Sequence, residues 1–168
     1  MDGSLLIREM ASADLDAVLE LFDAVASERL WIGTEPGYDR TRYRDTFGFA
    51  LGRGNGMFVA VLSSSEDDGK LVGIVTEHQQ EPYGHMVGMV VDEAYRGHGI
   101  GRALLERLIE WAQSRHLKYL NLSVFPHNER ARALYRSCGF VDYEPLPGGV
   151  RRASGEVWDA IVMRLTLR

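Results

Sequence analysis

The chain has 168 residues, of which 45% are hydrophobic and 26% charged. This length is enough for one domain with a buried core, and the composition excludes a disordered, collagen-like or coiled-coil protein. Twenty-four acidic against nineteen basic residues give a net charge of −5, which argues against general binding to nucleic acid or to an anionic membrane. The single cysteine, Cys138, excludes an internal disulfide framework and a cysteine-rich zinc site.

Targeting and membrane-spanning patterns are not found in the sequence. The chain opens without a basic n-region, and Arg8 and Glu9 interrupt its first apolar run, so we expect no signal peptide. No apolar stretch approaches the ~18 residues that a membrane helix needs. We therefore expect a cytoplasmic protein, and the sequence leaves both a monomer and a homodimer open.

In the first half of the chain, apolar spacing predicts strands and helices in alternation. A strand over 5–7 precedes an amphipathic helix over 13–28, and a second helix is expected around Tyr43, Phe47 and Leu51. Two strands over 57–62 and 71–77 follow, and the polar segment between them predicts a hairpin turn over 63–69.

The second half predicts a strand over 86–91, a glycine-containing loop, and a helix with an apolar stripe from Leu104 to Ala112. The remaining elements are a strand over 119–124, a short helix over 128–137 and two further strands over 140–143 and 157–167. Gly139 is expected to end the short helix as its C′ residue. The mixed order predicts a single domain over 1–168 of the α/β (mixed α+β) class, with a mixed sheet.

The loop between the strand and the long helix is the most informative segment. Gly97, Gly99 and Gly101 alternate in it, and Arg96 and Arg102 flank them. A helix N-terminus preceded by glycines presents free N–H groups to a phosphate or pyrophosphate. A Walker loop would need Lys-Ser/Thr after its last glycine, and a dinucleotide-binding loop would need a glycine where Arg102 stands. A simple connecting turn is the remaining alternative.

Two motifs together resemble the GNAT superfamily of N-acetyltransferases. Residues 96–101 match Arg/Gln-x-x-Gly-x-Gly/Ala, the acyl-CoA pyrophosphate loop of that superfamily. Its second motif, N-x-x-A-x-x-x-Y-x-x-x-G-F, is matched by Asn128, Ala131, Tyr135, Gly139 and Phe140. The element order of the whole chain is also similar, whereas the first fifty residues resemble the superfamily only in arrangement.

The resemblance implies a single GNAT-like domain whose mixed, mostly antiparallel sheet is splayed into a V, with helices on both faces. It implies direct transfer of the acetyl group of acetyl-CoA to a primary amine in a ternary complex, the acceptor being an amino acid, a related small molecule or a protein N-terminus. A non-catalytic acyl-CoA-binding module is the alternative. By this resemblance acetyl-CoA would contact Met89, Val90, Val91, Arg96, Gly97, His98, Gly99, Ile100, Gly101, Arg102, Asn128 and Tyr135.

Acid–base roles are assigned partly by residue type and partly by the resemblance. The residues alone favour Tyr135 as a core tyrosine, and the resemblance makes it the general acid that protonates the CoA thiolate. The amine must lose a proton before it attacks, and the candidates for the base are Glu77, Glu81, His85 or a water chain. No two histidines have metal-ligand spacing, so we expect no metal.

The acceptor pocket is predicted from loop aromatic residues. Trp31 and Tyr83, with His85 beside them, would line it, and a hairpin over 148–155 would close it. The alternative is that these aromatic side chains only pack against the core or its rim. The expected partners are thus a small-molecule or peptide amine, without nucleic acid or membrane.

Overall fold

The computed structural model describes residues 4–63 and 69–168. The predicted hairpin turn over 63–69 lies largely outside these residues. The elements are β1 (Ser4–Glu9), α1 (Leu15–Ser27), α2 (Arg40–Gly52), β2 (Met57–Ser63), β3 (Lys70–Gln80), β4 (Gly84–Val91), α3 (Ile100–Ser114), β5 (Tyr119–Val124), α4 (Glu129–Ser137), β6 (Val141–Arg151) and β7 (Val157–Thr166). Short 3₁₀ turns precede α1 and follow β4.

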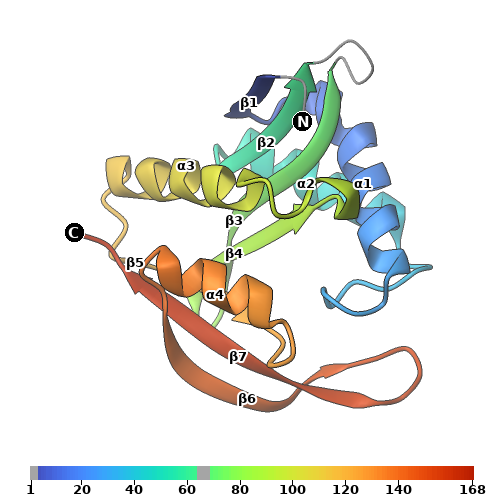
Figure 1. Ribbon diagram of the computed structural model, residues 1–168, viewed down its shortest axis with the longest axis vertical. Coiled ribbons are helices and arrows are strands. Elements are labelled where there is room, and N and C mark those ends of the chain that lie inside the picture. Colours follow the sequence, from blue (N-terminus) through green and yellow to red (C-terminus); the bar gives the residue numbers. More distant parts are fainter. Residues whose placement is uncertain (1–3, 64–68) are drawn as a thin grey trace.

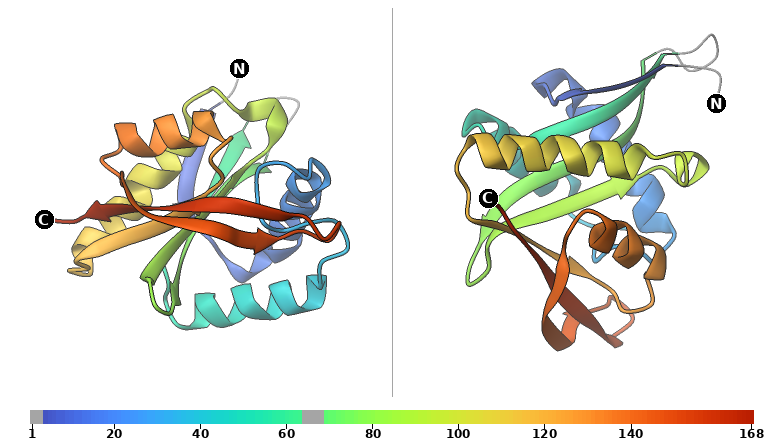
Figure 2. Two further views of the ribbon diagram at one scale, coloured as in Figure 1. Left: turned by 90° about the horizontal axis from the view of Figure 1, so that it is seen from below. Right: turned by 60° about the vertical axis from the view of Figure 1, so that its left-hand side comes forward.

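The strands form one sheet in the order β1-β2-β3-β4-β5-β7-β6 (Figure 1). Strands β4 and β5 pair parallel, and every other neighbouring pair is antiparallel. Helices α3 and α4 cover one face and α1 and α2 lie on the other (Figures 1 and 2). The predicted mixed, mostly antiparallel sheet with helices on both faces is therefore confirmed.

Helices α1 and α3 are fixed to the sheet by apolar stripes, whereas α2 has no buried residue. Leu104, Leu105 and Leu108 of α3 are fully buried against strands β2, β3 and β5. On the opposite face, Val18 and Val25 of α1 pack against Ile74 and Val90. Because the stripes recur at three- and four-residue spacing, α1 and α3 each turn one face to the core.

The two middle strands separate soon after they meet. Strand β4 pairs with β5 only at Met86–Asn121 and Val87–Leu122. The rest of β4 stays with β3, and the rest of β5 stays with β7. The sheet therefore opens into a V from Val87 onward, as expected.

Strand β6 differs from the prediction, which ended it at 143. It continues to Arg151 through Pro145, Pro147 and two glycines. These residues interrupt a central strand because proline cannot donate to its neighbours. In this sheet β6 is an edge strand, and register shifts at 142–144 and 146–150 absorb the irregular residues.

Candidate active site

A cavity of about 620 Å³ lies where β4 and β5 separate. It is lined by α1, the loop after α1, the free parts of β4 and β5, the glycine loop, α4 and β6. The cavity therefore reaches from the α3–α4 face of the sheet to the α1 face. It brings together residues that are more than a hundred positions apart in the chain.

Beyond its two pairs with β5, strand β4 turns backbone N–H groups toward this cavity. The N–H of Asp92 donates to the carbonyl of Val72 on β3. Backbone groups of successive residues in a strand point to opposite sides, so the amides of Met89 and Val91 point toward the gap with β5. The amide of Val90 points toward β3, so within this strand its neighbours are better placed than Val90 to meet a ligand carbonyl.

The glycine loop has the form of an anion cradle. Gly97 and Gly99 both have φ of +83°, a conformation that side chains disfavour. The first hydrogen bond of α3 runs from Ala103 N–H to Gly99, which leaves the amides of residues 100–102 as free N-terminal donors. A Cβ at Gly101 would lie 3.1 Å from Leu134, so only glycine leaves this approach open.

Three arginines line the cavity beside the loop, but they are held differently. Arg96 donates to both carboxylate oxygens of Glu28, at 2.8 and 2.6 Å, and to the carbonyl of Val91 at 2.9 Å. The hydrogen bonds from Arg96 hold the pKa of the Glu28 carboxyl below its usual range. Arg102 donates to Ser137 at 2.7 Å, and Arg130 lies against Gly97. Arg96 thus ties the loop to the end of α1, whereas Arg102 and Arg130 add positive charge at the cavity mouth.

Helix α4 and its N-cap residue form another part of the cavity wall. Asn128 caps it by accepting from the Ala131 N–H at 3.2 Å, and it also lines the cavity. The helix ends at Gly139, whose φ is +94°, with N–H bonds from Gly139 to Arg136 and from Phe140 to Tyr135. This is the predicted glycine C-cap. It fixes Tyr135 in the cavity wall.

Tyr135 is 8% exposed. Burial raises the pKa of its hydroxyl to about 12. The hydroxyl therefore stays protonated at neutral pH, which is the state that a proton donor requires.

Several predicted residues lie outside the cavity wall. Ile100 is a core residue of α3, and His98 is exposed with its ring beside the Tyr95 carbonyl. Glu77 is buried on β3 and its Oε1 lies 2.7 Å from Nδ1 of His85 on β4. Glu81 and Tyr83 belong to the hairpin turn that joins these two strands. The fold brings the base candidates together, but at the narrow end of the V.

Trp31 lines the cavity as predicted, together with Ile32 and Thr34 of the same loop. Arg130, which also lines the cavity, was not predicted from the sequence, although it is a cation in the first turn of a helix, where it opposes the helix dipole. Glu28 and Arg152 were not predicted either. Their roles depend on partners 68 or more residues away, and no local pattern marks such pairs.

Within residues 4–63 and 69–168, no three His, Cys, Asp or Glu residues are placed to hold a metal ion. No helix in the same residues is long and apolar enough to cross a membrane.

Known proteins share both this fold and parts of the sequence. The Acetyltransferase (GNAT) family model matches residues 18–140. An uncharacterised N-acetyltransferase of Methanocaldococcus jannaschii is 28% identical over 145 residues, which cover 85% of this chain and 82% of that protein. Other relatives are longer: the match to N-alpha-acetyltransferase 40 of Saccharomyces cerevisiae, at 35% identity, covers 51% of this chain and 33% of that protein.

Solved structures agree with these matches. Ribosomal-protein-alanine N-acetyltransferase from Brucella melitensis superposes with a TM-score of 0.83 at 28% identity, over 96% of this chain and 99% of the other. A phosphinothricin acetyltransferase from Sinorhizobium meliloti in complex with AcCoA has the same fold at 19% identity, with a TM-score of 0.83 over 99% of this chain and 89% of the other. The chain belongs to the GNAT family of acetyltransferases and is an acyltransferase.

Proposed function

We propose that residues 1–168 act as one N-acetyltransferase domain, which transfers the acetyl group of acetyl-CoA to a primary amine in a ternary complex. The observation that carries this proposal is the cavity itself, which joins the free amides at the N-terminus of α3 to the buried Tyr135, the proposed proton donor. Bound acetyl-CoA would supply an activated acetyl thioester. A non-catalytic acyl-CoA-binding module is not supported, because the family is one of acyltransferases.

The chain's own groups suit the binding of such a ligand. The free amides of residues 100–102 would hold a pyrophosphate at the positive end of the helix dipole. Arg102 and Arg130 would add charge-assisted contacts. The outward amides of Met89 and Val91 would pair with the amide groups of an extended arm. One of them would also polarise the thioester carbonyl, as an oxyanion donor does.

The proposed reaction needs two proton transfers, one to the departing thiolate and one from the attacking amine. The Tyr135 hydroxyl would protonate the departing thiolate. The proton of the attacking amine would pass through water to the Glu77–His85 pair, with Glu81 as the second candidate. This route is supported by the register of the sheet, since Glu77 lies opposite Val87, which lines the cavity.

The reaction is proposed to take place in the cytoplasm on a small-molecule or peptide amine. Cys138 is free and partly buried, as is usual where thiols stay reduced. The net charge of −5 supports a cationic amine over a nucleic acid as partner.

A transfer assay tests the proposal directly. The protein is incubated with acetyl-CoA and amino acid amides, free amino acids or N-terminal peptides, and both free thiol and N-acetylated product are measured. We expect equal amounts of thiol and product with at least one amine. Thiol release without acetylated amine would contradict direct transfer, and no binding of millimolar acetyl-CoA in calorimetry would contradict the proposal as a whole.

A further inference from the structure

The wall of the cavity away from the glycine loop is apolar, whereas the loop carries arginines and free N–H groups. The wall consists of Phe22 and Val25 of α1, Trp31 and Ile32 of the following loop, and Val150 of β6. Since the cradle and the V take the acyl donor in the proposed function, this wall remains for the acceptor. Thr34 of the same loop as Trp31 adds a hydroxyl to this wall, and that hydroxyl is already hydrogen-bonded to Tyr43 at 2.8 Å.

Negative charge is missing from this wall. Among the described residues that line the cavity, none is Asp, Glu or His. Glu28 and Glu35, which follow the wall residues Val25 and Thr34 in the chain, already have partners. Glu28 binds Arg96 through both oxygens. Glu35 lies 3.3 Å from the Arg152 guanidinium and accepts from the Ala153 N–H at 2.6 Å. Both are bound to cations, so neither is free for a second cation.

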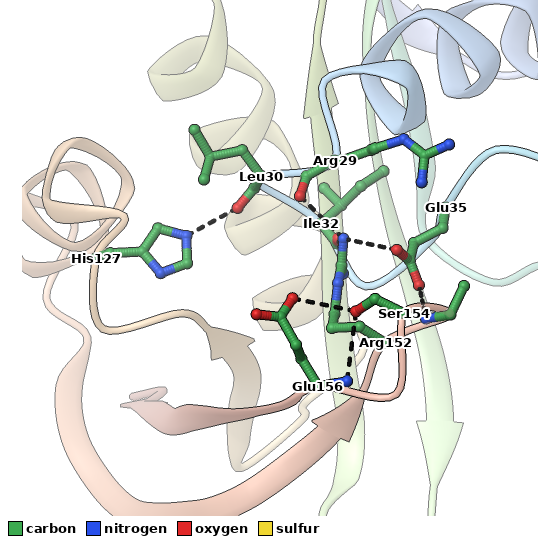
Figure 3. A network of polar contacts seen from close by, with 9 residues as sticks. Arg29, Leu30, Ile32, Glu35, His127, Arg152, Ser154 and Glu156 are labelled. Atoms are coloured by element: carbon green, nitrogen blue, oxygen red, sulfur yellow. Dashed lines mark hydrogen bonds and ion pairs between the residues drawn. The ribbon is translucent and has the colours of Figure 1, made fainter.

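Arg152 makes this arrangement rigid. Its side chain is 2% exposed and donates to the carbonyls of Arg29 and Ile32, each at 3.0 Å (Figure 3). The guanidinium also lies over the ring of Trp158, 4.3 Å from its centre. Turning Glu35 into the cavity would leave a buried guanidinium without its counter-charge, which is strongly unfavourable. Glu35 is therefore held outside the cavity, and the wall gains no carboxylate when a ligand binds.

We infer that the acceptor is a monoamine whose amine-bearing carbon carries an apolar group, and that amines with a second ammonium group are excluded. This inference rests on the proposed acetyl transfer. The apolar group would be buried against the wall. A second ammonium would lose its hydration there and find no carboxylate in exchange. The acceptor thus falls in the class of apolar amino acid amides and peptides with an apolar first residue, and polyamines fall outside it.

Norleucine amide and lysine amide form a matched pair of probes. They share the α-amine and the straight side chain, and lysine amide adds one ammonium. We expect kcat/KM for the α-amine to be more than tenfold higher with norleucine amide, and its binding to the CoA-saturated protein to be tighter in calorimetry by the same factor.

A variant of the wall sharpens the test. Val150→Glu places a carboxylate in it, and Val150→Gln is the control of equal size without charge. We expect Val150→Glu to shift the kcat/KM ratio at least tenfold toward lysine amide, and Val150→Gln to leave the ratio unchanged. Circular dichroism and thermal unfolding check that both variants fold; if Val150→Glu does not fold, Thr34→Glu with Thr34→Gln serves the same purpose.

The outcomes separate the inference from the proposed function. Equal use of the two amides by the wild-type protein, an unshifted ratio in the folded acidic variant, or no binding of either amide to the CoA complex would each overturn the inference alone. Failure of acetyl-CoA to bind would overturn the proposed function beneath it.

Discussion

Tyr135 is held in the cavity wall by the way its helix ends. The N–H of Phe140 bonds to the Tyr135 carbonyl, and the ring of the buried Phe140 lies 6.0 Å from that of Tyr135. The ring is therefore held in place, and burial keeps the hydroxyl protonated. Position and protonation state together are what a general acid needs.

Replacing Tyr135 by Phe removes the hydroxyl and keeps the ring. We expect kcat to fall by about 100-fold or less, the lower part of the usual range for acid catalysis, because a thiolate is a fairly stable leaving group. KM for acetyl-CoA should change little, as expected for an interaction made chiefly in the transition state. Unchanged kcat, measured where chemistry limits turnover, would return Tyr135 to the role of a core tyrosine.

The pKa of Tyr135 adds a second expectation for the wild-type enzyme. The hydroxyl ionises at about pH 12, so its protonated form persists through the alkaline range used for assays. We expect no fall in kcat from this group below about pH 11. A kcat that falls near pH 9 in the wild type and not in Tyr135→Phe would contradict the raised pKa of Tyr135.

Glu28 supports the glycine loop through Arg96, and its effect depends on pH. Its pKa is lowered in the folded protein by hydrogen bonds from Arg96. The stabilisation is therefore present above the ordinary carboxyl value of 4.5 and is lost as the pH falls through the lower folded value. Glu28→Gln should lower the free energy of unfolding at pH 7 by roughly 1–3 kcal/mol and flatten its acid dependence. Urea titrations at several pH values measure both effects, and equal acid dependence in the two proteins would contradict them.

At the scale of elements, the junction of the glycine loop with α3 needs its glycines for two different reasons. Gly99 has a φ of +83° and no neighbouring atom within 4 Å of an added Cβ. Gly101 has ordinary φ, but its added Cβ would press on Leu134 and Met89. Gly99 is needed for its left-handed backbone conformation, and Gly101 is needed because the backbone lies close to Leu134 and Met89.

Gly99→Val tests the cradle, and Gly155→Val is its matched control. Gly155 also has a strained φ of +90° with no neighbour within 4 Å, but it lies in the β6–β7 turn. Both variants should lose about 1–2 kcal/mol of stability from the left-handed conformation. Only Gly99→Val should also raise the acetyl-CoA dissociation constant, by at least about tenfold, because it blocks approach to the free amides. Equal dissociation constants in calorimetry would place the cradle elsewhere.

Arg152 joins the β6–β7 hairpin to the loop after α1. Arg152→Met should lower the free energy of unfolding by about 3–5 kcal/mol, because it leaves Glu35 without its buried partner. Arg151→Met, at the exposed neighbouring position, should change it by less than about 0.5 kcal/mol. Adding Glu35→Met to Arg152→Met should recover part of the loss. Chemical denaturation measures all three, and equal effects at 151 and 152 would contradict this role.

On the scale of the whole molecule, the two halves of the sheet meet through only two register pairs of β4 and β5. A ligand that lies between β4 and β5 would contact both halves at once. Binding to the folded state alone stabilises it in proportion to ligand concentration, by ~2.7 kcal/mol at 100 times the dissociation constant.

Acetyl-CoA at that concentration should therefore raise the unfolding temperature of this chain by about 5–10 °C. Differential scanning calorimetry with and without acetyl-CoA measures the shift. Gly155→Val should show the same shift as the wild type, and Gly99→Val a smaller one. No shift at millimolar acetyl-CoA would show that the cavity does not hold this ligand.

The strands, the helices and the family were determined by the sequence alone, because their signals are local. Helical spacing identified α1 and α3, and the prediction of Gly139 as the C′ residue of α4 was confirmed by its positive φ and its hydrogen bond to Arg136. The glycine loop and the Asn128–Phe140 motif identified the family from residues close together in the chain. Backbone hydrogen bonding and dihedral preferences act over a few residues, so such features can be inferred before the fold is known.

Only the tertiary structure decided which distant residues meet. Pairing of Arg96 with Glu28 and of Arg152 with Glu35 requires the loop after α1 to lie beside both the glycine loop and the β6–β7 turn. The course of β6 through two prolines was decided by its place at the edge of the sheet. The register of the β3–β4 hairpin brought the Glu77 carboxylate into contact with the His85 ring. Each result depends on sheet order and burial, which are properties of the whole packed chain rather than of any one segment.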